Sequence, residues 1–233
     1  MRHSRRYSQA LELLDREKTY SLKEAVQALK NVPKSKFDET VEISCKLGVD
    51  PRKSDQMVRG SVVLPHGTGR EVKVLVFCKG EKEREAREAG ADFVGLEEYI
   101  KKIEGGWFDF DCCIASPDVM REIGKLGRIL GPRGLMPSGK TGTVTQNIAF
   151  AVKQAKQGKV DFKMDKFGVV HCGVGKISFP EDGIVDNARA FLEALLNSKP
   201  PTVKGELIKS CYICTTMSPS LKVDWKNEVG KTS

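Results

Sequence analysis

The chain has 233 residues, with 39 Lys or Arg against 31 Asp or Glu and a formal net charge of +8. This length predicts one large domain or two small ones, since single cores usually divide beyond roughly 250 to 300 residues. The basic excess favours a polyanionic partner or an acidic surface, while an aromatic content of only 7% disfavours a protein that stacks many unpaired bases on aromatic rings.

Membrane and secreted classes are disfavoured by the apolar pattern. No apolar run approaches the roughly 20 residues that span a bilayer, and the basic start MRHSRR leads into a charged amphipathic segment instead of a signal peptide. We therefore expect a soluble, cytoplasmic protein with no membrane partner. The seven cysteines are an odd number scattered through strand-like runs, which predicts reduced, mostly buried thiols.

The first predicted elements are two helices and a strand. Helices are expected over residues 4–18 and 21–30, the second begun by Ser21 and Glu24 at the spacing of a capping box. Apolar and polar side chains then alternate over residues 40–48. This alternation predicts a strand with one face in a core and the other in water.

Strands and helices alternate regularly in the middle of the chain. Strands are expected at 72–77, 92–95 and 110–115, with helices at 81–89, 96–104, 118–130 and 147–156. Elements of this length and order predict parallel β-α-β units whose helices cover a sheet.

The last third of the chain, like the first, has strands and helices without the regular β-α-β alternation. Residues 160–179 alternate around a turn signal at 165–168, which predicts a hairpin. A helix at 181–198 and strands at 207–215 and 220–223 follow. Neither end alone has enough strands to cover its apolar face. We therefore predict a discontinuous two-domain protein of mixed class, with an α+β domain from residues 1–66 and 160–233 and an α/β domain inserted at 67–159.

One motif suggests nucleotide chemistry. The segment GLMPSGKT at 134–141 matches the phosphate-binding P-loop pattern. A P-loop follows a buried strand and opens into a helix, whereas here a helix precedes the match and GTVT follows it, and Pro137 removes one amide donor. A nucleotide-dependent enzyme, with Lys140 on phosphate and Thr141 on magnesium, stays an alternative hypothesis.

No other group of residues predicts catalysis or metal binding. Cys211 and Cys214 form a single CxxC inside a predicted strand, where positions three apart face opposite sides, and the three histidines show no ligand spacing. We expect no enzyme activity, no cofactor and no metal. Residues 121–159 carry eight basic side chains against one acid, which predicts phosphate contacts at the basic loop formed by Arg128, Arg133 and Lys140.

Four long segments carry a family resemblance: residues 47–70, 110–118, 120–145 (MREIGKLGRILGPRGLMPSGKTGTVT) and 209–219 (KSCYICTTMSP). Together they resemble the bacterial large-subunit ribosomal protein of the mobile stalk, the ribosomal protein L-one family. The resemblance implies a Rossmann-like three-layer insert, and a structural constituent of the large ribosomal subunit that is monomeric when free.

The resemblance also implies partners. These are 23S rRNA at the mobile stalk, deacylated tRNA whose release from the exit site the protein assists, its own operon mRNA, whose translation it represses, and other components of the cytoplasmic ribosome. A general binder of nucleic acid without a defined target is the less specific alternative.

The resemblance implies an RNA-binding surface, and part of it agrees with residue chemistry. Hydroxyls and carboxylates on the polar strand face can hydrogen-bond ribose and base edges, and lysines can meet phosphates. The chain departs from the family at Ser218, where a glycine is usual. The RNA-binding residues that the resemblance implies are Lys36, Phe37, Thr40, Glu42, Thr215, Thr216 and Met217. Residue chemistry adds Lys166, whose ammonium group can meet a phosphate.

Overall fold

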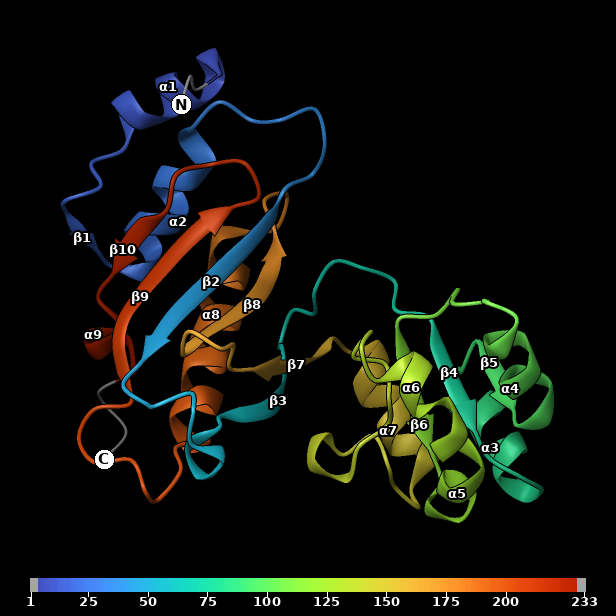
Figure 1. The fold of residues 1–233 in the computed structure, drawn as a ribbon. Coiled ribbons are helices and arrows are strands. Elements are labelled where there is room, and N and C mark those ends of the chain that lie inside the picture. Colours follow the sequence, from blue (N-terminus) through green and yellow to red (C-terminus); the bar gives the residue numbers. More distant parts are fainter. Residues whose placement is uncertain (1–3, 230–233) are drawn as a thin grey trace. The chain divides into compact units, whose positions relative to one another are not determined.

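The computed structural model describes residues 4–229 and divides the chain into two compact units (Figure 1). Unit 1 combines both chain ends, up to Gly69 and again from Val160, and unit 2 is Arg70–Lys159. The predicted discontinuous architecture is confirmed. Residues 67–69, which we expected in the insert, belong to unit 1, because the buried Asn187 side chain donates a 2.9 Å hydrogen bond to the carbonyl of Gly67.

A five-stranded sheet in the order β1-β10-β9-β2-β8 organises unit 1. Its three long strands β9, β2 and β8 are antiparallel, and β2, which comes from the N-terminal part of the chain, lies between two strands from the C-terminal part. The strands are β1 (Thr19–Tyr20), β2 (Thr40–Leu47), β8 (Val169–Lys176), β9 (Ile208–Thr215) and β10 (Leu221–Val223).

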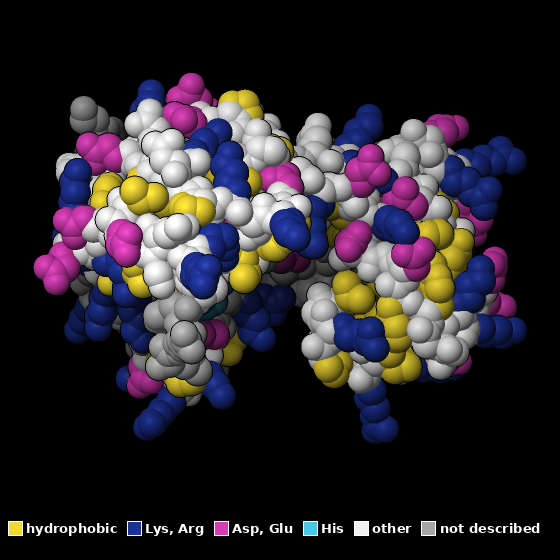
Figure 2. Space-filling model, turned by 90° about the horizontal axis from the view of Figure 1, so that it is seen from above, with side chains coloured by type: hydrophobic (Ala, Val, Ile, Leu, Met, Phe, Trp, Pro, Cys, Tyr) yellow, Lys and Arg dark blue, Asp and Glu magenta, His cyan; other side chains and the backbone are white. Residues whose placement is uncertain are grey.

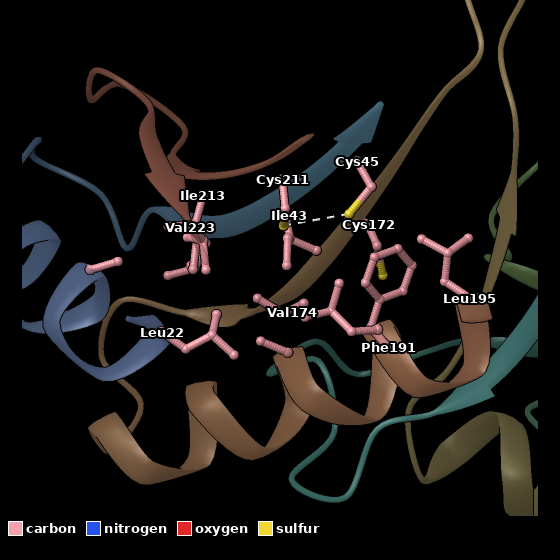
Figure 3. Packing of buried hydrophobic residues seen from close by; sticks show 14 of the residues in the cluster. Leu22, Ile43, Cys45, Cys172, Val174, Phe191, Leu195, Cys211, Ile213 and Val223 are labelled. Carbon is pink, nitrogen blue, oxygen red and sulfur yellow. Dashed lines mark hydrogen bonds between the residues drawn. The ribbon is translucent and has the colours of Figure 1, made fainter. Parts of the chain in front are cut away.

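Helices cover one face of this sheet and leave the other open (Figure 1). Helices α2 (Leu22–Asn31) and α8 (Glu181–Asn197) pack against the apolar face, where Figure 3 shows Phe191 and Leu195 of α8 pointing toward the strands. The alternate side chains of β2 are not buried. The predicted alternation of a core face and a solvent face is therefore confirmed.

The first helix is shorter than predicted. Helix α1 is Arg5–Leu13 instead of 4–18, because the Asp15 side chain accepts the N–H groups of Glu17 and Lys18 and holds a non-helical turn there. The capping box of α2 is confirmed, with reciprocal hydrogen bonds between Ser21 and Glu24. A last short helix, α9 (Trp225–Val229), follows β10.

The predicted hairpin at 160–179 is wrong in its pairing. The turn forms, with Gly168 donating to the carbonyl of Asp165, but β7 (Lys159–Lys163) pairs with β3 (Arg59–Val63) while β8 pairs with β2. Phe162 of β7 is buried against Phe191 of α8, with ring centroids 5.5 Å apart. This contact draws β7 away from β8, and a turn signal in the sequence does not specify such a tertiary contact.

Unit 2 is a three-layer α/β fold, as predicted. Its parallel sheet has the order β5-β4-β6. Alternate residues of the central strand enter separate cores on the two faces, which explains why all four are buried. The strands are β4 (Val74–Phe77), β5 (Phe93–Gly95) and β6 (Cys112–Ala115).

Helices cover both faces of the sheet in unit 2. One layer contains α3 (Glu81–Glu88) and α7 (Ile148–Lys156), and the other α4 (Glu97–Glu104), α5 (Met120–Ile123) and α6 (Gly127–Leu130). The single helix predicted at 118–130 is broken by 3-10 turns at Pro117–Val119 and Gly124–Leu126. Two glycines, at 124 and 127, weaken this segment as a continuous α-helix. Two further 3-10 turns are Ser54–Gln56 and Gly139–Thr141.

The cysteines are free, and five of the seven are buried. Burial raises the pKa of the Cys172 thiol to about 12 and that of Cys113 well above its ordinary value. Since the thiolate is the reactive form, we expect the native protein to react slowly with a thiol reagent at neutral pH and all seven thiols to react quickly in denaturant. Only Cys112 and Cys214 are partly exposed. Rapid reaction of more than two thiols in the native protein would therefore contradict this prediction.

No helix within residues 4–229 is both long enough and apolar enough to cross a bilayer.

Candidate RNA interface at one end of the sheet

The upper end of the sheet in Figure 1 is formed by the start of β2 and the turn after β9. The N–H of Thr40 donates to the hydroxyl of Thr216 (3.1 Å), and the N–H of Thr216 donates to the carbonyl of Thr40 (3.0 Å). These bonds extend the ladder one step beyond the paired residues Val41 and Thr215. They join segments 176 residues apart in sequence, so this surface exists only because both chain ends share one sheet.

Glu39, directly before β2, is only 3% exposed. Its carboxylate accepts hydrogen bonds from the N–H of Ser35 (2.9 Å), the hydroxyl of Thr215 (2.5 Å) and the N–H of Met217 (3.1 Å). Burial alone would raise the pKa of Glu39, but these hydrogen bonds outweigh burial and hold the pKa below its ordinary value. An ionised carboxylate therefore ties the loop before β2 to the turn after β9.

Arg6 of α1 completes this arrangement from a third segment. Its guanidinium lies 3.7 Å from the Glu39 carboxylate and donates to the carbonyls of Pro33 (3.2 Å) and Met217 (3.1 Å). One cation thus balances the buried charge and holds both flanking segments. Sequence reasoning missed Arg6 and Glu39, because charged residues near a helix start or strand start are usually solvated.

The side chains presented around this buried pair differ in chemistry. Lys36 and Thr216 are exposed, and two apolar side chains are exposed beside them, Phe37 at 53% and Met217 at 47%. Figure 2 looks onto this end of unit 1, where basic side chains lie beside hydrophobic ones. Such a surface can meet phosphates through ammonium groups and sugars or bases through apolar contact.

A further lysine belongs to the same surface. The ammonium of Lys176, at the end of β8, donates to the hydroxyl of Thr40 (3.0 Å) and the carbonyl of Asp38 (3.3 Å). Glu42 is exposed two residues along β2. Sequence reasoning did not nominate Lys176, because its place beside Thr40 depends on the β2–β8 register, which includes a bulge.

Thr215 does not present its side chain to a ligand. It is 4% exposed, and its hydroxyl donates to Glu39. Thr215 was predicted to lie on the RNA surface. The alternation of β9 instead turns this side chain inward, where it supports the neighbouring Thr216.

Ser218 closes the turn after β9. Its hydroxyl accepts the N–H of Thr215 (2.8 Å) and donates to the carbonyl of Pro219 (3.0 Å). No non-glycine residue among residues 4–229 has a positive φ. A serine at this position therefore causes no backbone strain here, and its side chain adds a hydrogen bond that glycine lacks.

Lys166 lies at the opposite end of the sheet. It is in the turn before β8, whose first residue pairs with Lys46 at the far end of β2. Six residue steps along a strand correspond to about 20 Å. Lys166 and the exposed Phe167 beside it (64%) therefore form a separate patch, and one RNA would have to extend along the open face to reach both.

The P-loop match in unit 2 lacks the structure of a P-loop. It follows α6 and leads into the 3-10 turn Gly139–Thr141, and the Thr141 hydroxyl is engaged by Ser138 and Thr143. In the predicted basic loop, Arg128 is exposed, whereas the Arg133 guanidinium stacks 3.6 Å from the Phe108 ring centroid. The side chain of Lys140 lies outside the described part of the structure.

These features define a class of protein: an α+β unit made from both chain ends, with an open polar sheet face, that carries an inserted three-layer α/β unit. Residues 28–219 match the model of the Ribosomal protein L1p/L10e family. The chain belongs to this family and is a ribosomal protein, which agrees with the prediction that it is not an enzyme.

Curated relatives extend the similarity over nearly the whole chain. The large ribosomal subunit protein uL1 of Protochlamydia amoebophila is 53% identical over 223 residues, which cover 96% of this chain and 94% of the relative. The proteins of the same name from Phocaeicola vulgatus and Bacteroides thetaiotaomicron are each 56% identical, with 93% and 94% of this chain covered and 94% of each relative.

Proposed function

We propose that this protein is a structural constituent of the large ribosomal subunit that binds 23S rRNA at the mobile stalk through the upper end of the unit 1 sheet. The relatives named above are large-subunit proteins, and a cytoplasmic, ribosomal location goes with that role. The observation that carries the proposal is the Thr40–Thr216 pairing supported by buried Glu39.

The proposed contacts follow from what each side chain can offer. Lys36 and Lys176 meet phosphates, the Thr216 hydroxyl meets ribose or base groups, and Phe37 and Met217 pack on sugars or bases. Glu42 accepts hydrogen bonds from ribose or base donors. Because Glu39 and Arg6 hold the surface before RNA arrives, little ordering entropy is lost on binding.

Replacing both Thr216 and Met217 by alanine should weaken binding to a stalk rRNA fragment by about tenfold or more, the equivalent of about 1.4 kcal/mol. Both side chains are exposed, and the backbone bond from the Thr216 N–H to the Thr40 carbonyl (3.0 Å) remains when the hydroxyl is lost, so the fold should be retained. Ser44→Ala is the matched control, because Ser44 lies in the middle of the same face and bonds to His171 (2.9 Å). Filter binding measures the affinities. Equal affinities for the double variant and the unmodified protein would contradict the proposed RNA surface.

We further propose that the same surface binds the protein's own operon mRNA, so that free protein represses its translation. One surface cannot hold two RNAs, so the rRNA fragment should displace the mRNA competitively.

We also propose that the protein assists release of deacylated tRNA from the exit site. The exposed Arg128 of unit 2 is the residue proposed to contact this tRNA. Arg128→Gln should slow tRNA release from ribosomes without changing affinity for the rRNA fragment.

A further inference from the structure

The topology of unit 2 separates two loops at one edge of its sheet. From the central strand β4 the chain passes through α3 to β5 on one side, and then through α4 to β6 on the other side. The loops that leave β4 and β6 therefore diverge at the carboxyl ends of neighbouring parallel strands. In open α/β sheets, ligands bind in the crevice outside the strand ends at this change of direction.

A cavity of about 290 Å³ occupies this position. It opens between the loop after β4 and the loop after β6, the two segments that the topology separates. It is lined by Lys79, Glu81, Lys82, Ser116, Asp118 and Val119.

Ser116 is the most informative side chain in this lining. The residue is 1% exposed, and its backbone is held by bonds to the carbonyl of Phe77 and from the N–H of Val119. Within residues 4–229, the Ser116 hydroxyl has no hydrogen-bond partner, whereas every fully enclosed polar side-chain atom has one. The hydroxyl is therefore not fully enclosed. The Ser116 hydroxyl therefore faces the cavity and is free to bond a ligand inside it.

Backbone donors lie beside this hydroxyl. Helix α3 begins at Glu81 after the N-cap residue Gly80, and no side chain caps its first turn. The first N–H groups of a helix have no partner inside the helix and carry partial positive charge. In α3 the N–H of Glu83 donates to the carbonyl of Gly80 (3.1 Å), so the N–H groups of Glu81 and Lys82 supply the anion-binding edge to the cavity.

Two lysines add charge to the same place, and each is paired with a carboxylate. Lys79 lies 2.6 Å from Glu122, and Lys82 lies 2.9 Å from Asp118. Both pairs are exposed, and such pairs contribute little stability, so an incoming anion can compete for the ammonium groups. Asp118 and Glu81 at the rim oppose an anion, which predicts weak to moderate binding.

We propose that this cavity binds the phosphate group of a small phosphate monoester, with the Ser116 hydroxyl, the first amides of α3 and the Lys79 and Lys82 ammonium groups as donors. All of these groups are donors or cations, as a phosphate requires. Because Ser116 is almost fully buried, the phosphate has to enter the cavity. The terminal phosphate of a monoester can enter. The phosphate of a nucleic-acid backbone carries a nucleoside on each side and therefore cannot.

The test is a titration of the ¹⁵N-labelled full chain with inorganic phosphate and with 5′-AMP, followed by NMR. We expect the amide signals of the loops after β4 and β6 to shift and saturate at a concentration on the order of 1 mM or below. Ser116→Ala and Lys82→Gln should each weaken binding by about tenfold. Lys102→Gln is the matched control, since Lys102 of the same unit also pairs with an exposed carboxylate outside the cavity.

Two results would overturn the proposal: no saturable shift with either probe, or equal weakening by all three substitutions. Lys82→Gln keeps the test valid if Ser116→Ala does not fold, because Lys82 is on the surface. Adding the rRNA fragment identifies the source of the phosphate. A monoester site keeps its affinity for 5′-AMP when RNA is bound, whereas displacement of 5′-AMP by RNA would contradict the monoester. The RNA surface of unit 1 is not involved, so either proposal can fail alone.

Discussion

Glu39→Gln is expected to destabilise the protein by about 2 to 4 kcal/mol, because a buried carboxylate that accepts several hydrogen bonds is replaced by an amide with one acceptor oxygen. The carboxylate accepts from Ser35, Thr215 and Met217 and faces Arg6. A glutamine has to direct its NH₂ group toward a donor or toward the guanidinium. Urea unfolding followed by circular dichroism measures the loss.

The pH dependence of unfolding gives this prediction a second readout. The folded-state pKa of Glu39 is lowered from an ordinary value of 4.5, so its stabilisation is complete above about pH 4.5 and is lost as the pH falls through the lower folded-state pKa. The Gln variant should lose this part of the acid dependence and differ most from the unmodified protein at neutral pH.

RNA affinity should fall together with stability in Glu39→Gln, since the same carboxylate positions the turn that carries Thr216 and Met217. Glu42→Gln is the control for stability alone. Glu42 is an exposed carboxylate on the outward face of β2, so its replacement should leave the free energy of unfolding unchanged within about 0.5 kcal/mol. A Glu39 variant with normal stability would show that its hydrogen bonds do not hold the loops together.

Local patterns were enough to predict much of unit 1 and unit 2. The alternation along β2, the capping box at Ser21 and the strand–helix order of the insert are set by residues close in sequence, and each is confirmed. Errors arose where a distant partner decides the outcome. Strand β7 leaves β8 because Phe162 packs on Phe191, and a turn signal contains no information about that contact.

The candidate site shows the same division. The exposed residues Lys36, Phe37, Thr216 and Met217 were predicted through the resemblance, and the polar face of β2 followed from the alternation along that strand. The groups that hold these residues in place were missed, because Glu39 becomes a buried acceptor only after three separate segments converge on it. Residues that support a surface are recognised by their partners, and partners require the fold.

Asn187 is another buried polar residue whose role depends on distant partners. It is 0% exposed on α8, accepts the N–H of His66 (3.0 Å), and donates to the carbonyls of Gly67 (2.9 Å) and Val174 (2.8 Å). One amide thus fixes α8 to β8 and to the segment that leads from unit 1 to unit 2. It uses both its donor and its acceptor capacity on backbone groups.

Asn187→Ala should therefore destabilise unit 1 by about 3 kcal/mol, since three backbone groups lose their buried partner at once. Asn227→Ala is the matched control, because Asn227 is an exposed residue of α9 whose side chain donates to the Asp224 carboxylate. This change should alter stability by less than about 0.5 kcal/mol. Amide hydrogen exchange locates the effect, which should appear in α8 and β8 and spare the sheet of unit 2. Faster exchange throughout both units would mean that the two unfold together, and an unchanged rate in α8 would mean that the amide does not anchor this segment.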